Sequence, residues 1–230
     1  MNLCRILSLS ITLCIGLLFA ASAEAFTTTL IDFNDSQNPG FGWNTLNQAQ
    51  HHTTVPLVFD DGTASGVSIF LPSFSDSANA GWNPAVALPS WAPNAAANDY
   101  STFNGFCCDG GTESVHFLLS NLDPGRLYQF DVIASRNLDR VQDLTITHAG
   151  GVDSLLDWNT QTDGWMAGQV LHSNILRPDG ANKIRLEFRR HGTSGAFNAM
   201  RITSLPEPKS LALMTFGLVG LAICGGRDRR

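Results

Sequence analysis

Residues 183–189, Lys-Ile-Arg-Leu-Glu-Phe-Arg, are the stretch that decides the fold. Apolar and charged side chains alternate along it one by one, as in a strand with one face in a core and the other in water. We therefore predict that Ile184, Leu186 and Phe188 face the core.

Further runs of strand-forming residues lie on both sides, separated by turn residues. They are 29–34, 55–60, 66–72, 114–122, 126–136, 142–149, 154–158, 167–174 and 197–205. Pro124 and Gly125 form a turn that joins two of these runs as a hairpin, because proline presets φ and glycine tolerates positive φ. No long helical period appears, so the pattern predicts an all-β sandwich or barrel.

The length and the charge distribution narrow the protein class. A chain of 230 residues fits one domain plus targeting segments. Its formal net charge is −6, and no lysine or arginine occurs between Arg5 and Arg126. Binding to a phosphate backbone needs clustered basic side chains, so nucleic acid is excluded as a partner and a cation or a neutral polymer is favoured.

Residues 1–25 have the three parts of a secretory signal peptide. Arg5 supplies a basic start, residues 6–21 are apolar, and the small residues Ala23 and Ala25 precede Phe26. We expect cleavage after Ala25.

The other end of the chain, residues 206–230, has the features of a membrane-sorting tail. Pro206-Glu207-Pro208 is followed by an uncharged segment, 210–226, and by a terminal arginine cluster made of Arg227, Arg229 and Arg230. At about 1.5 Å per residue a helix over the uncharged segment reaches about 25 Å, which crosses a membrane only marginally. The arginines are expected to anchor the tail on the cytoplasmic side of the membrane. The prolines are expected to keep the chain stiff and extended just outside the membrane, where a protease can reach it.

This tail resembles the PEP-CTERM sorting signal of Gram-negative bacteria. The resemblance implies export through the Sec translocon, recognition by a membrane-embedded exosortase, and cleavage near Pro206 to Pro208. It also implies a link to extracellular polysaccharide at the cell surface or in a matrix. Lys209 departs from the family pattern, in which a small or hydroxylated residue usually follows the motif.

The middle segment, 26–205, is similar to the galactose-binding-like jelly-roll modules of exported bacterial proteins. The similarity rests on residues 42–46, 61–67, 122–128, 135–136 and 197–202. It implies a jelly-roll sandwich that binds carbohydrate or serves as a display scaffold. No ligand residue of the family maps onto this sequence.

A candidate sugar site lies in 73–104, which we expect to form long loops at one end of the sandwich. Exposed indoles stack on sugar rings, so Trp82 and Trp91 are the predicted platform, with Asn83 and Asp99 as hydrogen-bonding groups. For the two indoles beside strand patterns we expect core or rim packing: Trp43 and Trp158.

Carboxylates beside flexible turns suggest calcium. The candidates are two separate turns, one with Asp60 and Asp61 and the other with Asp109 and Glu113, although neither has the spacing of an EF-hand loop and ordinary turns are the alternative. No other cofactor is expected. The adjacent Cys107 and Cys108 can form a strained disulfide in an oxidising compartment or stay as two thiols.

No catalytic signature is present. Ser194 lies in a glycine-rich turn but lacks the Gly-x-Ser-x-Gly elbow of hydrolases. We therefore expect a non-enzymatic surface or matrix protein. The alternatives are a glycan-processing enzyme that uses Asp99 and Asp109, and a scaffold without a ligand.

Overall fold

The computed structural model describes residues 25–34, 37–77, 81–104 and 113–207. Several predicted features lie outside these ranges: Ala23, Cys107, Cys108, Asp109, Pro208, the segment 210–226, Arg227, Arg229 and Arg230. None of the helices within the described ranges is both long enough and apolar enough to cross a membrane.

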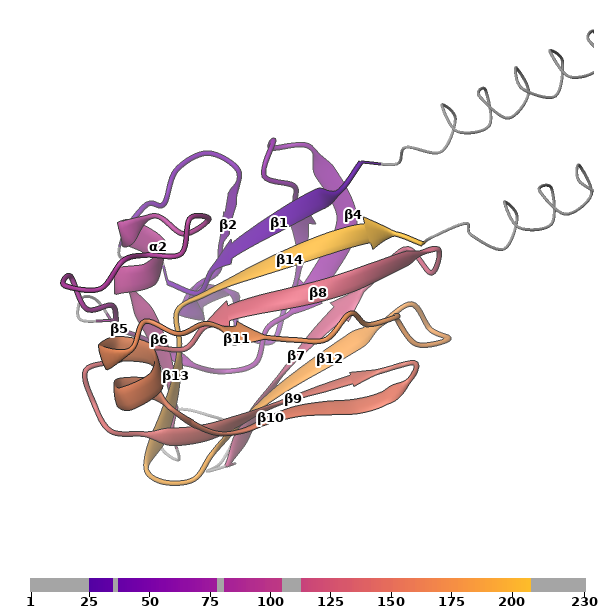
Figure 1. The fold of residues 1–230 in the computed structure, drawn as a ribbon. Coiled ribbons are helices and arrows are strands. Elements are labelled where there is room, and N and C mark those ends of the chain that lie inside the picture. The colour runs from indigo at the N-terminus through magenta and orange to yellow at the C-terminus, as the bar shows by residue number, and fades with distance from the viewer. Residues whose placement is uncertain (1–24, 35–36, 78–80, 105–112, 208–230) are drawn as a thin grey trace, which may run out of the picture.

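The described chain forms a β-sandwich of two large sheets and one small sheet (Figure 1). The five-stranded sheet has the order β11 (Leu171–His172), β8 (Arg126–Ile133), β14 (Ala199–Pro206), β1 (Thr27–Asp32), β2 (Trp43–Thr45). The six-stranded sheet has the order β10 (Gly151–Asn159), β9 (Val141–His148), β12 (Ile184–Arg190), β7 (Ser114–Ser120), β4 (Ala64–Phe70), β3 (Thr54–Val58). The predicted sandwich is thereby confirmed.

Short elements complete the fold. The small sheet contains β13 (Ser194–Phe197), β6 (Tyr100–Asn104) and β5 (Ser75–Ser77). The helical segments are η1 (Gln48–Gln50), α2 (Asn94–Asn98) and the π-helix η2 (Thr160–Met166).

The main core lies between the two large sheets. Ile184, Leu186 and Phe188 of β12 are all buried in it, which confirms the prediction from their alternation. Phe197 joins the core to the small sheet, with its ring centroid 5.3 Å from that of Phe188 and 5.2 Å from that of Phe117. Such tilted and edge-on aromatic pairs add attraction beyond the area they bury.

Within 73–104, where we expected only long loops, residues 81–93 are loops and turns, whereas β5, α2 and β6 are regular elements. Residues 81–98 pack on the outer face of the five-stranded sheet and build a second apolar cluster there, against Ile133 of β8 and Ala199 of β14. The members that residues 81–98 contribute are mostly small: Trp82, Ala92, Ala96 and Ala97, with Val86, Leu88 and Trp91 partly buried beside them. Small alanine side chains let this segment approach the sheet closely.

Asn198 connects the second cluster to the sheet. Its Nδ2 donates to the carbonyls of Ala97 and Asp99 at 2.9 and 3.0 Å, and its Oδ1 accepts from the Ser135 amide at 2.8 Å. The side chain is fully buried, so these bonds satisfy polar groups that water cannot reach.

The first and last strands of the described chain are neighbours. Thr27 of β1 pairs with Ser204 of β14, so both ends leave the same end of the sandwich (Figure 1). The strand β14 runs through Pro206, which pairs with Arg126. Pro206, the first residue of the predicted sorting motif, is therefore the last residue of β14.

Candidate functional site

One line of residues crosses the outer face of the five-stranded sheet from edge to edge. Strand register places Trp43 beside Leu30, Leu30 beside Arg201, Arg201 beside Asp131, and Asp131 beside His172. We call these five residues the Arg201 row. Alternate residues of a strand point to opposite faces, and the flanking Met200 and Ile202 belong to the core, so the row points outward.

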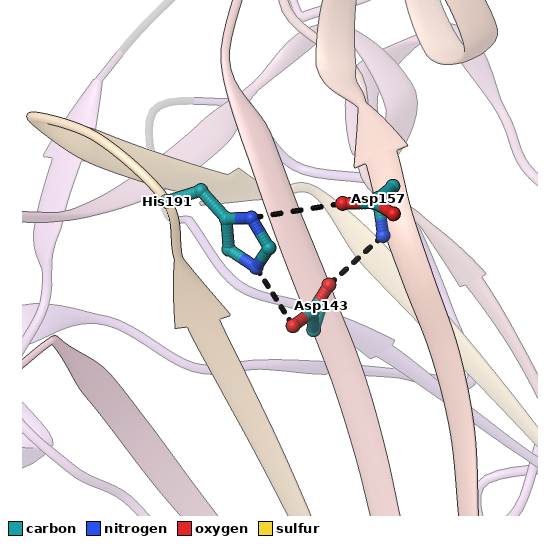
Figure 2. Close-up of side chains that lie close together, drawn as sticks. All are labelled: Asp143, Asp157 and His191. Carbon is teal, nitrogen blue, oxygen red and sulfur yellow. Dashed lines mark hydrogen bonds and ion pairs between the residues drawn. The ribbon is translucent and has the colours of Figure 1, made fainter.

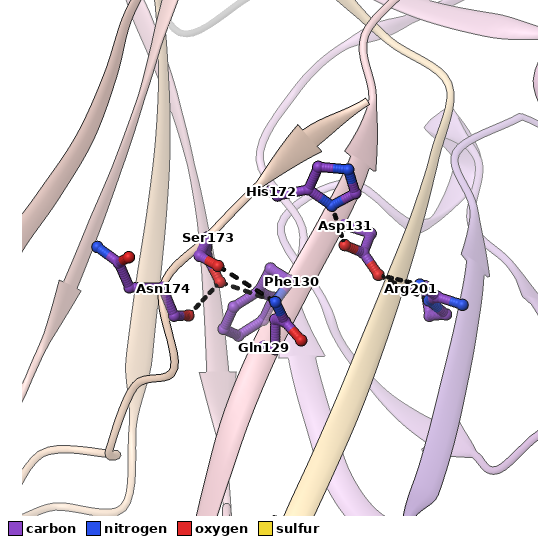
Figure 3. Close-up of polar contacts among 7 residues, drawn as sticks. All are labelled: Gln129, Phe130, Asp131, His172, Ser173, Asn174 and Arg201. Carbon is purple, nitrogen blue, oxygen red and sulfur yellow. Dashed lines mark hydrogen bonds and ion pairs between the residues drawn. The ribbon is translucent and has the colours of Figure 1, made fainter. Parts of the chain in front are cut away.

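Asp131 is the centre of the polar half of the row (Figure 3). Its Oδ2 accepts from Arg201 Nε at 2.7 Å and contacts Nη2 at 2.5 Å, while its Oδ1 contacts His172 Nδ1. The Asp131 side chain is only 3% exposed, whereas that of His172 is 62% exposed. A buried carboxylate thus holds two cationic or hydrogen-bonding side chains in place at the surface.

Ser173 keeps His172 beside Asp131. Its hydroxyl accepts from the Phe130 amide at 2.9 Å and donates to the Asn174 carbonyl at 2.7 Å (Figure 3). The Ser173 amide also donates to the Phe130 carbonyl, so the short strand β11 is bonded to β8 beyond its two residues.

Trp91 contacts two residues of the row, Trp43 and Arg201. Its ring stacks on Trp43 with a centroid distance of 6.3 Å and an interplanar angle of 20°, and the Arg201 guanidinium lies 5.2 Å from its centroid. Cation–π attraction and stacking together orient this half-buried indole. Trp91, although not one of the five residues of the row, is therefore a fixed indole next to the fixed polar groups of the row.

Of the four residues predicted for the sugar site, Trp91 is the half-buried indole that stacks on Trp43 and lies under the Arg201 guanidinium. Trp82 is 2% exposed, and its Nε1 donates to the Val86 carbonyl at 3.1 Å. Asp99 is fully buried and accepts from Gln37 Nε2 at 2.9 Å. The structure instead makes Trp82 and Asp99 interior residues, because the segment that carries them covers the sheet.

Asn83 has a local role: its Oδ1 accepts from the Ala85 amide at 3.0 Å within a turn. The two indoles expected in core or rim positions lie there. Trp158 packs against the main core and donates from Nε1 to the Ala134 carbonyl at 2.7 Å, and Trp43 packs against the second cluster.

Sequence reasoning missed Arg201, Asp131 and His172. A charged residue in the middle of an apolar strand pattern was the available signal, since Asp131 follows Phe130 and Arg201 follows Met200. Only the strand register brings the two charges together.

Two separate turns were predicted as calcium sites, and of their ligands Asp60 and Asp61 of the first turn and Glu113 of the second lie within the described residues. Asp61 lies in the turn between β3 and β4, where its Oδ1 accepts from the Thr63 amide at 2.8 Å and from the Thr63 hydroxyl at 2.6 Å. These bonds favour the carboxylate and lower the pKa of Asp61. This turn, with Asp60, is at the end of the sheet where β7 finishes.

Glu113 lies at the opposite end of β7, directly before its first residue. Its Oε2 pairs with Arg189 Nη2 at 2.9 Å, and the hydrogen bond and charge of Arg189 lower the pKa of Glu113. Turn formation and an ion pair therefore account for the positions of Asp61 and Glu113.

Comparison with known proteins gives only distant likenesses. No protein-family model and no curated protein matches the chain. The ANXUR1 extracellular domain of Arabidopsis thaliana is 12% identical over 78% of this chain and 49% of its own, with a TM-score of 0.47. The module TmCBM61, solved with β-1,4-galactotriose, is 15% identical over 76% of this chain and 100% of its own, with a TM-score of 0.31.

The chain thus spans about half the length of the ANXUR1 chain that it matches. These likenesses assign no activity to this chain.

Proposed function

We propose that this chain is an exported, non-catalytic protein of a Gram-negative cell surface or matrix, and that it binds carbohydrate through the Arg201 row. Residues 1–25 direct it through the Sec translocon. The tail holds it in the inner membrane until an exosortase cuts near Pro206 to Pro208. The sandwich between is a jelly-roll module that stays with extracellular polysaccharide.

The observation that supports carbohydrate binding is the position of Trp91 beside Arg201. A sugar ring has an apolar face that stacks on an indole and hydroxyl groups that need hydrogen-bond partners at its rim. Trp91 and the Arg201 row together offer both on one sheet face, and Asp131 prevents the polar groups from turning away. Sites held in place in this way lose less conformational entropy on binding.

The polar groups have bonding capacity left. Arg201 uses Nε and Nη2 on Asp131, and His172 uses Nδ1. Within the described residues, Arg201 Nη1 and His172 Nε2 make no hydrogen bond or ion pair to the protein. These two nitrogens are the proposed contacts to sugar hydroxyls.

The buried position of Asp99 disfavours the glycan-processing alternative, because a catalytic carboxylate must reach the substrate. A scaffold without a ligand remains the competing function. The binding test must therefore distinguish a carbohydrate-binding protein from such a scaffold.

The test is a glycan array probed with the whole chain in mild detergent, alongside the variants Trp91→Ala and Phe41→Ala. Phe41 is an exposed aromatic residue outside the row and serves as the matched control. We expect the wild type and Phe41→Ala to retain the same glycans and Trp91→Ala to lose them. A wild-type array without any signal would favour the scaffold.

Export is tested separately by intact-mass measurement of the protein from its native envelope. We expect a chain that starts at Phe26 and ends near Pro208. A full-length mass would contradict both processing steps.

A further inference from the structure

A second cluster of polar side chains lies on the six-stranded sheet, away from the Arg201 row. Asp143 of β9, Asp157 of β10 and His191, which directly follows β12, converge there from three neighbouring chain segments (Figure 2). One oxygen or nitrogen atom from each of the three lies within 4.8 Å of the other two.

A β-bulge presents Asp157 to the other two residues. The pairing of β10 with β9 shifts register between Leu155 and Trp158, and Asp157 has a left-handed φ of 57°. Its amide donates to Asp143 Oδ1 at 2.9 Å. Bulges redirect a side chain from its normal place on the sheet, and here the redirected side chain faces His191.

The imidazole of His191 lies between the two carboxylates. Its Nε2 is 2.7 Å from Asp143 Oδ2, and its Nδ1 is 3.7 Å from Asp157 Oδ1. The Asp157 side chain is 81% exposed, so it can rotate toward a shared ligand without disturbing the core. Tetrahedral zinc with ligands at about 2.0 to 2.1 Å needs donor atoms about 3.3 Å apart. Here the three donor atoms, one from each residue, lie within 4.8 Å of one another.

The surroundings leave space for further ligands. An open depression of about 470 Å³ adjoins the cluster and is lined by Glu113, Asp143, Arg189, Arg190, His191 and Gly192. Of the two arginines, Arg189 is paired with Glu113 at 2.9 Å, and Arg190 donates to the Gly192 carbonyl. Water molecules in the depression can complete the coordination of an ion.

We infer that Asp143, Asp157 and His191 bind a divalent transition-metal ion of the zinc type. An imidazole nitrogen with two carboxylates suits zinc, whereas calcium takes six to eight oxygen ligands. The bound ion links the edge strand β10 to β9 and to the turn after β12. This site is independent of carbohydrate binding at the Arg201 row.

The experiment titrates ZnCl₂ into the whole chain, tag-free, in mild detergent and stripped of metal with a chelator. We expect the wild type to bind one zinc ion per chain. In Asp157→Asn and in His191→Gln the zinc affinity should fall by about tenfold or more, or binding should be lost, since even residues that only orient a ligand contribute about tenfold to metal affinity. Asparagine tolerates the left-handed backbone at position 157, so Asp157→Asn keeps the fold.

The matched control is Asp153→Asn. Asp153 is also on β10 and lies 3.7 Å from a histidine, His148, but belongs to no three-residue cluster among the described residues. It is expected to bind zinc as the wild type does. Melting temperatures without metal show whether each variant is folded.

Cobalt(II) supplies a second readout, because its visible absorption reports the coordination geometry. We expect a tetrahedral-type spectrum in the wild type that disappears in Asp157→Asn and that an equal concentration of CaCl₂ does not reduce. Absence of zinc binding, binding unchanged in both Asp157→Asn and His191→Gln, or displacement by equimolar calcium would each overturn the inference.

Discussion

Arg201 and Asp131 face each other across the neighbouring strands β14 and β8, and Arg201 Nε donates to Asp131 Oδ2 at 2.7 Å. The same guanidinium covers Trp91, and the same carboxylate holds His172. One ion pair therefore orients Arg201 over Trp91 and Asp131 beside His172. Stability and binding are expected to depend on it together.

Replacing Asp131 by alanine should lower the free energy of unfolding by about 2 kcal/mol, because it removes charge-assisted bonds and leaves Arg201 without its partner. Urea unfolding measures this. The control Asp157→Asn, measured with chelator present, should stay within about 0.5 kcal/mol of the wild type. Equal stabilities of Asp131→Ala and the wild type would show that the pair is energetically unimportant.

Replacing Asn198 by alanine should cost about 3 kcal/mol, since it leaves two buried carbonyls and one buried amide without their partner. The amide of Ser135 should also exchange with deuterium faster. Asn174→Ala, at an exposed position, is the control. If the free energy of unfolding falls by less than about 1 kcal/mol, water must replace the hydrogen bonds of Asn198, which would contradict the full burial of this side chain.

Two glycines with left-handed φ separate backbone strain from steric clash. A Cβ at Gly42 would lie 2.0 Å from the Asp60 carbonyl oxygen, whereas one at Gly66 meets nothing within 4 Å. We expect Gly66→Ala to cost about 1 kcal/mol from φ alone and Gly42→Ala to cost at least about 1 kcal/mol more. Identical urea midpoints for the two variants would contradict the close approach at Gly42.

Stability at high pH should depend on Tyr128. Burial raises the pKa of its phenol, and its hydroxyl accepts from the Asp123 amide at 2.8 Å. Between the unfolded pKa of about 10 and the raised folded pKa, the folded chain binds more protons, so stability falls as pH rises. Urea midpoints across this pH range should fall more steeply for the wild type than for Tyr128→Phe. If the midpoints of the two proteins fall equally with pH, Tyr128 is not the cause of the pH dependence.

Local sequence pattern was sufficient for the long strands and insufficient for the short ones. The alternation over 183–189 needs only a core on one side, and β12 follows it closely. By contrast β2, with three residues, has no alternation long enough to recognise and is held by pairing with β1. In the run 167–174 only β11 forms, because η2 and the left-handed Gly168 occupy the chain before it.

The site was predictable only in its chemistry. Aromatic side chains and carboxylates indicated a sugar-binding surface, but the position of each depends on contacts between distant segments. Trp82 is buried in a cluster that also contains Ala97 and Ala199, and Ala199 lies about a hundred positions further along the chain. The Arg201 row likewise exists only through the register of five strands.

The most direct test of carbohydrate binding is isothermal titration of the whole chain with the glycan that gives the strongest array signal. Removing a stacked aromatic should weaken binding by about tenfold, so Trp91→Ala should lose that factor or more while Phe41→Ala binds as the wild type does. Melting temperatures confirm that both variants are folded. An affinity of folded Trp91→Ala equal to that of the wild type would contradict the account.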